Sequence, residues 1–208
     1  MNKKTKKTVL FCAASLFIIV SWHIMAEAKT YAQVITDKLY SDEKAGFPDL
    51  TLPAPPDRTE REYLGLSGKN TFRVGDINAE IIIIEIFSFH CPSCQAQAPH
   101  VNKLYNNIQA DPNLRDRVKM IGIGATNSPF EARSFKESHH VPFPVFSDED
   151  SEIAIALNVK YTPTFIGVRV NGKGLQQQFY WRPGAFTNPS QFLQEILKAS
   201  GTGLNKNN

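Results

Sequence analysis

Two cysteines that stand two residues apart are the side chains with the clearest chemistry in this chain. They lie in the segment Cys91-Pro92-Ser93-Cys94, directly after a β-branched apolar run and directly before a predicted helix. Unpaired amides and the dipole at a helix N-terminus favour a negative charge, so we expect the pKa of Cys91 to be lowered. A Cys91 thiolate can attack a disulfide, and Cys94, one turn further into the helix, can resolve the mixed disulfide that forms. This dithiol chemistry needs no cofactor.

Two other roles for the cysteine pair are weaker. A disulfide between Cys91 and Cys94 closes so short a loop that it restricts the unfolded chain little, which argues against a purely structural bridge. Closed zinc sites use four ligands, and the sequence holds no second Cys-x-x-Cys pair. We therefore expect no metal site.

The hydrophobic pattern predicts strands and helices that alternate around the cysteines. Residues 81–87 are a β-branched run, apolar on both faces except at Glu85, which is typical of a strand inside a sheet covered on both sides. Asn171-Gly172 predicts a hairpin between two antiparallel strands. The other predicted elements are a helix at 95–108 interrupted by Pro99, a strand at 118–125, a helix from the capping box at 128–131 to His139, a strand at 143–146, a helix at 151–157, strands at 164–170 and 176–181, and a helix that begins at Pro189 and stops at Gly201. This order predicts an α/β fold with a mixed central sheet sandwiched by helices.

The N-terminal residues have the composition of an export signal. A lysine run at 3–7 precedes an apolar stretch at 9–22, and Ala26-Glu27-Ala28 has the small-x-small form of a signal-peptidase site. We expect residues 1–28 to be a signal peptide or an N-terminal membrane anchor, with the rest of the chain in the periplasm or otherwise outside the cytoplasm. The remaining chain is interpreted as a linker or N-terminal extension at 29–68, one domain at 69–201 and a disordered tail at 202–208.

The charge pattern argues against a nucleic-acid partner. The formal net charge of +3 depends on the N-terminal lysine run, and without it the chain is close to neutral. The remaining sequence has no stripe of lysines and arginines and no basic motif interleaved with aromatic residues.

The cysteine segment and its flanks resemble the thioredoxin superfamily, with a resemblance that covers about residues 72–200. Glu85 stands six residues before Cys91, where members of the superfamily place a buried acid that moves protons for the resolving cysteine. Pro99 follows Cys94 by five residues and resembles the proline that kinks the active-site helix. The string at 85–92 also resembles the DsbA-type disulfide oxidases of the periplasm.

A second match lies just before the predicted hairpin. The segment Tyr161-Thr162-Pro163-Thr164 resembles the cis-proline loop of the superfamily, which lies against the disulfide and binds the substrate backbone. The resemblance implies a cis peptide bond before Pro163. His90 either stabilises the neighbouring thiolate or is an ordinary surface side chain. The residues that we assign are Cys91, Cys94, Glu85 and Pro163 to catalysis, and Thr162, Pro92, Ser93 and His90 to substrate binding.

The spacing of these motifs points to one group within the superfamily. Sixty-eight residues separate Cys94 from Pro163, which resembles the TlpA-like and redoxin proteins, a group that includes membrane-tethered reductases outside the cytoplasm. Ser93 stands where the DsbA-type oxidases have His, which argues against strong oxidising power. The resemblance implies a thiol-disulfide oxidoreductase without cofactor, here expected to be a reductase of protein disulfides. Its partners would be protein thiols and disulfides and a membrane-bound or periplasmic redox protein that recycles it.

Two other functions stay open at this point. A thiol peroxidase of redoxin type is compatible with the spacing, but Ile84 stands where such enzymes have a proline. A copper-delivery module that resembles the Sco-type proteins would bind soft metal through both thiolates, although those proteins have a wider cysteine spacing and a distant histidine ligand.

Overall fold

The computed structural model describes residues 47–68, 70–172, 174 and 176–204. The predicted signal peptide or anchor at 1–28 lies outside the described residues, as do parts of the predicted linker and tail. Within the described part, no helix is both long and apolar enough to cross a membrane.

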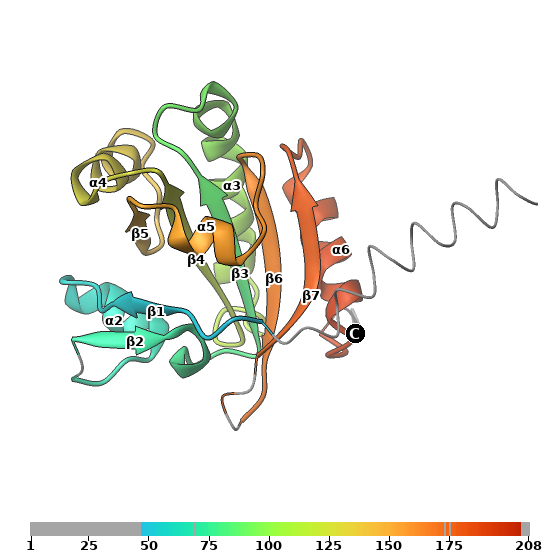
Figure 1. Ribbon diagram of the computed structural model, residues 1–208. Helices are drawn as coiled ribbons and strands as arrows, with labels where there is room; N and C mark the ends of the chain where they lie inside the picture. The colour runs from blue at the N-terminus through green and yellow to red at the C-terminus, as the bar shows by residue number, and fades with distance from the viewer. Residues whose placement is uncertain (1–46, 69, 173, 175, 205–208) are drawn as a thin grey trace, which may run out of the picture. The chain divides into compact units, whose positions relative to one another are not determined.

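A five-stranded mixed sheet forms the centre of the described chain (Figure 1). Its strand order is β5-β4-β3-β6-β7, so β3 lies in the middle. β3 pairs in parallel with β4 and antiparallel with β6, while β5 is parallel to β4 and β7 is antiparallel to β6. The bounds are Ile81–Phe87 for β3, Val118–Ala125 for β4, Val145–Asp148 for β5, Thr164–Val170 for β6 and Gln176–Pro183 for β7. The predicted mixed sheet and its hairpin are confirmed.

The two faces of β3 are buried against different groups of side chains. Every residue of β3 is buried. Ile81, Ile83 and Phe87 belong to a core shared with α3, α4 and α6, whereas Ile82, Ile84 and Ile86 belong to a second core shared with α5 and the N-terminal described segment. Successive side chains of a strand point to opposite faces, so a run that is apolar at every position needs cover on both sides.

Two of the helices, α4 and α6, begin at residues that the sequence marks as caps. The bounds are Pro92–Ala110 for α3, Pro129–Ser138 for α4, Glu152–Ala156 for α5 and Pro189–Ser200 for α6. Ser128 and Glu131 form the predicted capping box of α4, and the Asn188 side chain accepts a hydrogen bond from the Gln191 amide at the start of α6. Proline at the first helical position fits both starts, because its missing N–H would have no helical partner there. In Figure 1, α3 and α6 lie behind the sheet and α5 in front.

Two details differ from the sequence prediction. The strand expected at 143–146 is observed as β5 two residues later, because Pro144 lacks an N–H; it contributes only its carbonyl, to the Gly122 amide. The helix expected from residue 95 begins at Pro92, which places Cys94 inside its first turn.

Residues 47–68, which the sequence analysis placed in a linker or N-terminal extension, carry regular structure. The short strand β1 (Thr51–Pro53) pairs antiparallel with β2 (Thr71–Arg73), and α2 (Arg58–Leu64) lies between them in sequence. A single 3-10 turn, Val74–Asp76, follows β2. Leu52, Leu64 and Phe72 are buried in the core on the α5 side of the sheet. This segment therefore covers part of one face of the sheet.

Candidate active site

Three chain segments meet at the end of the sheet that holds the C-terminus of the central strand β3. β3 and β4 are parallel, so the segments that follow them, at 88–91 and 126–128, leave the sheet at the same edge. β6 is antiparallel to β3, so the segment before it, at 161–163, arrives at that edge too. Cys91 is the cap residue of α3 and Cys94 lies in its first turn. The fold thus brings the predicted cis-proline loop to the cysteines.

The Cys91 sulfur is partly exposed and has polar neighbours on two sides. Its Sγ atom lies 3.3 Å from Ser93 Oγ and 3.4 Å from the Thr162 carbonyl oxygen. Partial burial opposes ionisation of this thiol, but hydrogen bonds from the side chains of Ser93 and Thr162 and from Cys94 outweigh it and lower the pKa of Cys91 to about 7. A large fraction of Cys91 is therefore thiolate at neutral pH, as an attacking cysteine requires.

Cys94 has the opposite character. Its side chain is fully buried in the core beneath α3. Burial, together with the hydrogen bond that it shares with Cys91, raises the pKa of Cys94 to about 12. At neutral pH Cys94 is a thiol, so it becomes a nucleophile only when another group removes its proton.

Glu85 is a buried acid on the face of the sheet that carries α3. It alternates with Ile83 and Phe87, which belong to the core that contains Cys94. Only 2% of Glu85 is exposed, and burial raises its pKa to about 8. Among the described residues, no hydrogen-bond partner reaches its Oε1 atom. A carboxyl group with this pKa can accept and release a proton near neutral pH.

The peptide bond between Thr162 and Pro163 is cis, as the resemblance implied. Pro163 is buried, and its carbonyl accepts a hydrogen bond of 2.7 Å from the Gly184 amide at the end of β7. The Thr164 hydroxyl donates to the Tyr161 carbonyl at 2.6 Å. These bonds fix the loop whose Thr162 carbonyl faces Cys91. Pro92 and Ser93 are exposed beside it, where a substrate can reach them.

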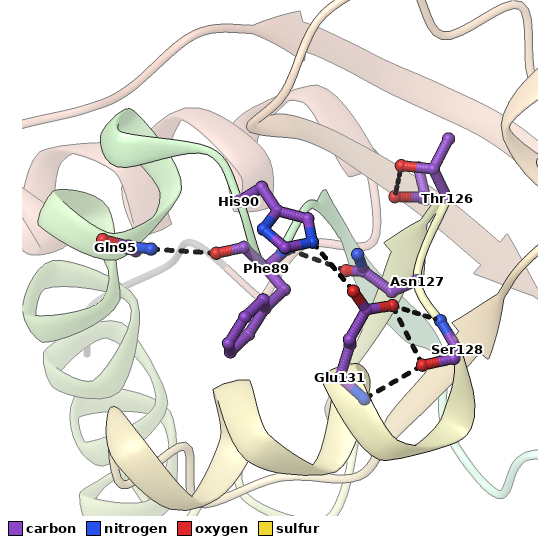
Figure 2. Close-up of polar contacts among 8 residues, drawn as sticks. Phe89, His90, Gln95, Thr126, Asn127, Ser128 and Glu131 are labelled. Atoms are coloured by element: carbon purple, nitrogen blue, oxygen red, sulfur yellow. Dashed lines mark hydrogen bonds and ion pairs between the residues drawn. The ribbon is translucent and has the colours of Figure 1, made fainter.

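The His90 side chain, in the turn before α3, binds a carboxylate on α4 (Figure 2). Its Nε2 atom lies 2.8 Å from Glu131 Oε1, while 67% of the side chain remains exposed. The ring also contacts Phe89 edge to face, with 5.0 Å between ring centroids. The groups that lower the pKa of Cys91 are Ser93, Thr162 and Cys94, and His90 is not among them.

Asn127 and Glu131 connect the cysteine segment to the start of α4, a role that sequence analysis did not assign to them. Asn127 is fully buried, and its Oδ1 atom accepts a hydrogen bond of 2.8 Å from the Phe89 amide. The Phe89 carbonyl accepts a further 2.8 Å bond from Gln95 Nε2 (Figure 2). Glu131 binds Ser128 through one oxygen and His90 through the other. The capping box was a visible signal for Glu131, but nothing in the sequence marked its second contact.

Asn127→Ala is expected to destabilise the protein by about 1–3 kcal/mol, because it leaves the Phe89 amide without its side-chain acceptor. The midpoint of urea unfolding of the variant, compared with that of the wild type, measures the effect. Equal stability of wild type and Asn127→Ala would show that this bond does not hold the segment.

Ser93→Ala is expected to move the alkylation of Cys91 by iodoacetamide to higher pH, because it removes the Ser93 hydrogen bond to the thiolate. Below the new midpoint the rate should fall roughly two- to tenfold, as a hydrogen bond of about 0.5–1.5 kcal/mol implies. Ser93→Thr, which keeps a hydroxyl, is the matched control. An unchanged pH profile in Ser93→Ala would exclude Ser93 as a source of the low pKa.

Within the described residues, no group of three or more histidine, cysteine or acidic side chains is arranged to hold a metal ion. The site as described is a pair of thiols of unequal acidity, a buried acid and a cis-proline loop.

Comparison with known proteins gives relatives of similar sequence. The chain is 24% identical over 113 residues to the thiol-disulfide oxidoreductase ResA of Bacillus thuringiensis subsp. konkukian, covering 54% of this chain and 61% of the relative. It is 20% identical over 98 residues to ResA of Halalkalibacterium halodurans, covering 47% of this chain and 53% of that protein. The matched region thus spans less than two thirds of the length of these relatives.

Solved structures with low sequence identity show the fold. A candidate thiol:disulfide interchange protein DsbE from Chlorobium tepidum superposes with a TM-score of 0.56 at 18% identity, covering 75% of this chain and 96% of that chain. A secreted disulfide oxidoreductase of Mycobacterium tuberculosis that is homologous to DsbE gives a TM-score of 0.51 at 17% identity, covering 72% and 96%. The expected thioredoxin-like fold is confirmed. The model of the AhpC/TSA family matches residues 45–190, which include both cysteines, the buried acid and the cis-proline loop, and the chain therefore belongs to the AhpC/TSA family.

Proposed function

We propose that this protein is an extracytoplasmic thiol-disulfide oxidoreductase that reduces disulfides of other proteins through Cys91 and Cys94. The observation that carries the proposal is the unequal setting of two thiols in one helical turn: Cys91 is partly exposed beside Ser93 and the cis-proline loop, whereas Cys94 is fully buried. Their pKa values, about 7 and about 12, follow this difference. A reactive outer thiolate and a protected inner thiol are what a two-step exchange requires.

The reaction follows from these two acidities. The Cys91 thiolate attacks one sulfur of a substrate disulfide, an S–S bond forms to Cys91, and the other substrate sulfur leaves as a thiolate and takes up a proton. Glu85, as its carboxylate, accepts the proton of Cys94. The Cys94 thiolate then attacks Cys91 Sγ, which releases the second substrate sulfur and leaves a Cys91–Cys94 disulfide. Two electrons pass from the protein to the substrate, and the substrate gains two protons.

The direction of electron flow is inferred from the acidity of Cys91. A lower thiol pKa stabilises the reduced protein and makes its disulfide more oxidising, as in DsbA, where the pKa is about 3.5, compared with about 7 in thioredoxin. The pKa of Cys91 is on the thioredoxin side. The side chain that Ser93 places beside Cys91 Sγ is a neutral hydroxyl and not a cation. Both features support a reductase.

The location outside the cytoplasm is supported by the N-terminal sequence, with its lysine run, apolar stretch and small-x-small site. The ResA relatives are named as thiol-disulfide oxidoreductases, which favours the dithiol reaction over a peroxidase or a copper-delivery role.

Equilibration of the protein with glutathione or dithiothreitol buffers tests the proposal, with the fraction of Cys91–Cys94 disulfide read by mass. A reduction potential near about −270 mV supports a reductase, and one near about −120 mV would instead make the protein an oxidase. Absence of any reversible couple would overturn the dithiol reaction. Peroxide consumption by the reduced protein, measured in parallel, separates a peroxidase from both.

A further inference from the structure

Two neighbouring residues at the point where β4 ends are held in unfavourable local states. Thr126 has a φ of 58°, in the left-handed region that β-branched residues rarely adopt. Asn127 is fully buried, and among the described residues nothing accepts a hydrogen bond from its Nδ2 group. Both features destabilise the folded chain. Such features gather at functional sites, and these two lie at the end of the sheet that holds Cys91.

The left-handed Thr126 completes a turn that folds the next residue back towards the sheet. The Asn127 amide donates to the Gly124 carbonyl at 3.2 Å, so Thr126 is the third residue of a four-residue turn, where a positive φ ordinarily calls for Gly or Asn. Gly124 leaves room for the side chain that is folded back, since a Cβ atom there would lie 2.8 Å from Asn127 Oδ1. The Thr126 amide also donates to the Asp148 carbonyl at the end of β5, at 2.9 Å. This turn therefore fixes the place of the Asn127 side chain.

The Asn127 side chain ends against the turn that carries the attacking cysteine. The Cys91 amide closes this cysteine turn by donating to the Ser88 carbonyl at 3.0 Å. Asn127 Oδ1 accepts the hydrogen bond of the Phe89 amide, within the same turn, at 2.8 Å (Figure 2). His90 binds α4 from this side too, but 67% of its side chain is exposed, and exposed ion pairs contribute little. The buried Asn127 is therefore the stronger tie between β4 and the cysteine turn.

The position of the cysteine turn decides how the sulfur meets the cis-proline loop. Ser93 is two residues from Cys91 and moves with it. Thr162 is 71 positions away, on a loop that the bond between Pro163 and Gly184 fixes independently. The 3.4 Å distance from Cys91 Sγ to the Thr162 carbonyl oxygen therefore depends on where the turn holds Cys91. Thr162 is among the groups that lower the pKa of Cys91, so a displaced turn would lose part of the stabilisation of the thiolate.

We propose that Asn127 is a positioning residue: through the Phe89 amide it holds Cys91 in contact with the cis-proline loop. This inference rests on the proposed function and adds to it a residue that contacts neither of the two sulfurs. It also accounts for the unfavourable states at the end of β4. An apolar residue at position 127 would be easier to bury, but it would release the Phe89 amide.

The test measures the alkylation of Cys91 by iodoacetamide against pH in the full chain that carries Asn127→Ala, without denaturant. The midpoint should move to higher pH, and below it the rate should fall roughly two- to tenfold, as the loss of one hydrogen bond to a thiolate implies. Single-turnover reduction of hydroxyethyl disulfide by the reduced variant should slow by a similar factor. A variant that is less stable but keeps the wild-type profile would give Asn127 a purely structural role and overturn the inference.

A second variant reaches the same contact without changing Asn127. In Gly124→Ala the added Cβ atom would lie 2.8 Å from Asn127 Oδ1, so the side chain must move, and the profile should shift in the same direction. Asn102→Ala is the matched control. Asn102 Nδ2 donates to the His139 carbonyl at 2.9 Å across 37 positions, much as Asn127 joins residues 38 positions apart, but its bond holds the loop after α4. The control should lose stability and keep the wild-type profile.

A double-mutant cycle shows whether Asn127 acts through the cis-proline loop. Thr162→Val removes a hydroxyl that lowers the pKa of Cys91, and should shift the profile by itself. In the Asn127→Ala background the same substitution should shift it less, because the displaced Cys91 has already lost that contact. Additive shifts would overturn the inference, and so would an equal shift in Asn102→Ala.

Reaction of the wild type with hydroxyethyl disulfide separates this inference from the proposed function. If the wild type reduces that small disulfide but Asn127→Ala has the wild-type alkylation profile, only the positioning role is rejected. If the wild type does not reduce it, the proposed function is rejected, and a positioning role in that reaction with it.

Discussion

Cys94→Ser should accumulate as a mixed disulfide with its substrate and lose nearly all turnover. Cys91, with a pKa of about 7, can still attack a substrate disulfide, but no second thiol is left to release the product. Incubation of the reduced variant with a cystine peptide should give one adduct per protein chain, seen by mass under non-reducing conditions. Dithiothreitol should remove it.

Cys91→Ser is the matched control for this trapping experiment. The remaining thiol, Cys94, is fully buried and has a pKa of about 12, so it should form no adduct on the same timescale at pH 7. Adducts that form equally fast in both variants would show that the two thiols do not have the unequal roles assigned to them.

Glu85→Gln should make the protein more stable at pH 8 and remove much of the pH dependence of its stability. Burial raises the pKa of Glu85 to about 8 in the folded protein, against an ordinary value of 4.5. Below about pH 4.5 Glu85 is protonated in both the folded and the unfolded protein, so no stability is lost through its ionisation there. Between about pH 4.5 and 8 only the unfolded chain releases the proton, and the free energy of unfolding falls by up to roughly 5 kcal/mol. Gln cannot ionise, so urea unfolding of the variant between pH 5 and 8 should lack this fall.

The same substitution should slow the second step of the reaction. Gln cannot accept the proton of Cys94, and removal of a general base typically costs about 10²–10⁴ in rate. In wild type the decay of the mixed disulfide should accelerate as pH rises towards about 8, where Glu85 becomes ionised, and in Glu85→Gln this acceleration should be absent. Alkylation of Cys91 serves as the control and should change little. A wild-type decay profile in the variant would restrict Glu85 to a structural role.

Most of the central sheet could be predicted from the sequence, because each of its strands and turns is marked by a short local pattern. The apolar run of β3 predicts a buried strand and the capping box of α4 predicts a helix start, each within a few residues. Both predictions are confirmed. The hairpin between β6 and β7 follows from Asn171-Gly172 in the same way. By contrast, β1 and β2 have three residues each, too few to show a period, and they are stabilised by burial of Leu52 and Phe72 in the core.

In the candidate site, too, only the residues with a local sequence signal could be predicted. Cys91, Cys94 and the cis bond before Pro163 could be predicted because spacing and resemblance mark them. The Asn127 contact to the Phe89 amide could not, since it joins residues 38 positions apart and depends on the order of β3 and β4 in the sheet. A buried amide side chain has no sequence pattern that distinguishes it from an ordinary loop residue.

The meeting of three loops at one sheet edge has a consequence for how the chain matures. Cys91 touches a carbonyl 71 positions away, and its neighbour His90 binds an acid 41 positions away. Contacts of such high sequence separation form late in folding, because the chain between them must first be ordered. In a refolding chain, the sulfur therefore has only its local partners Ser93 and Cys94 until β6 docks beside β3 and brings in Thr162, whose side chain also lowers the pKa of Cys91. Full nucleophilicity thus arrives with the completed sheet, so an immature chain has less opportunity for wrong disulfide exchange, and pulsed alkylation of Cys91 would report the moment at which folding ends.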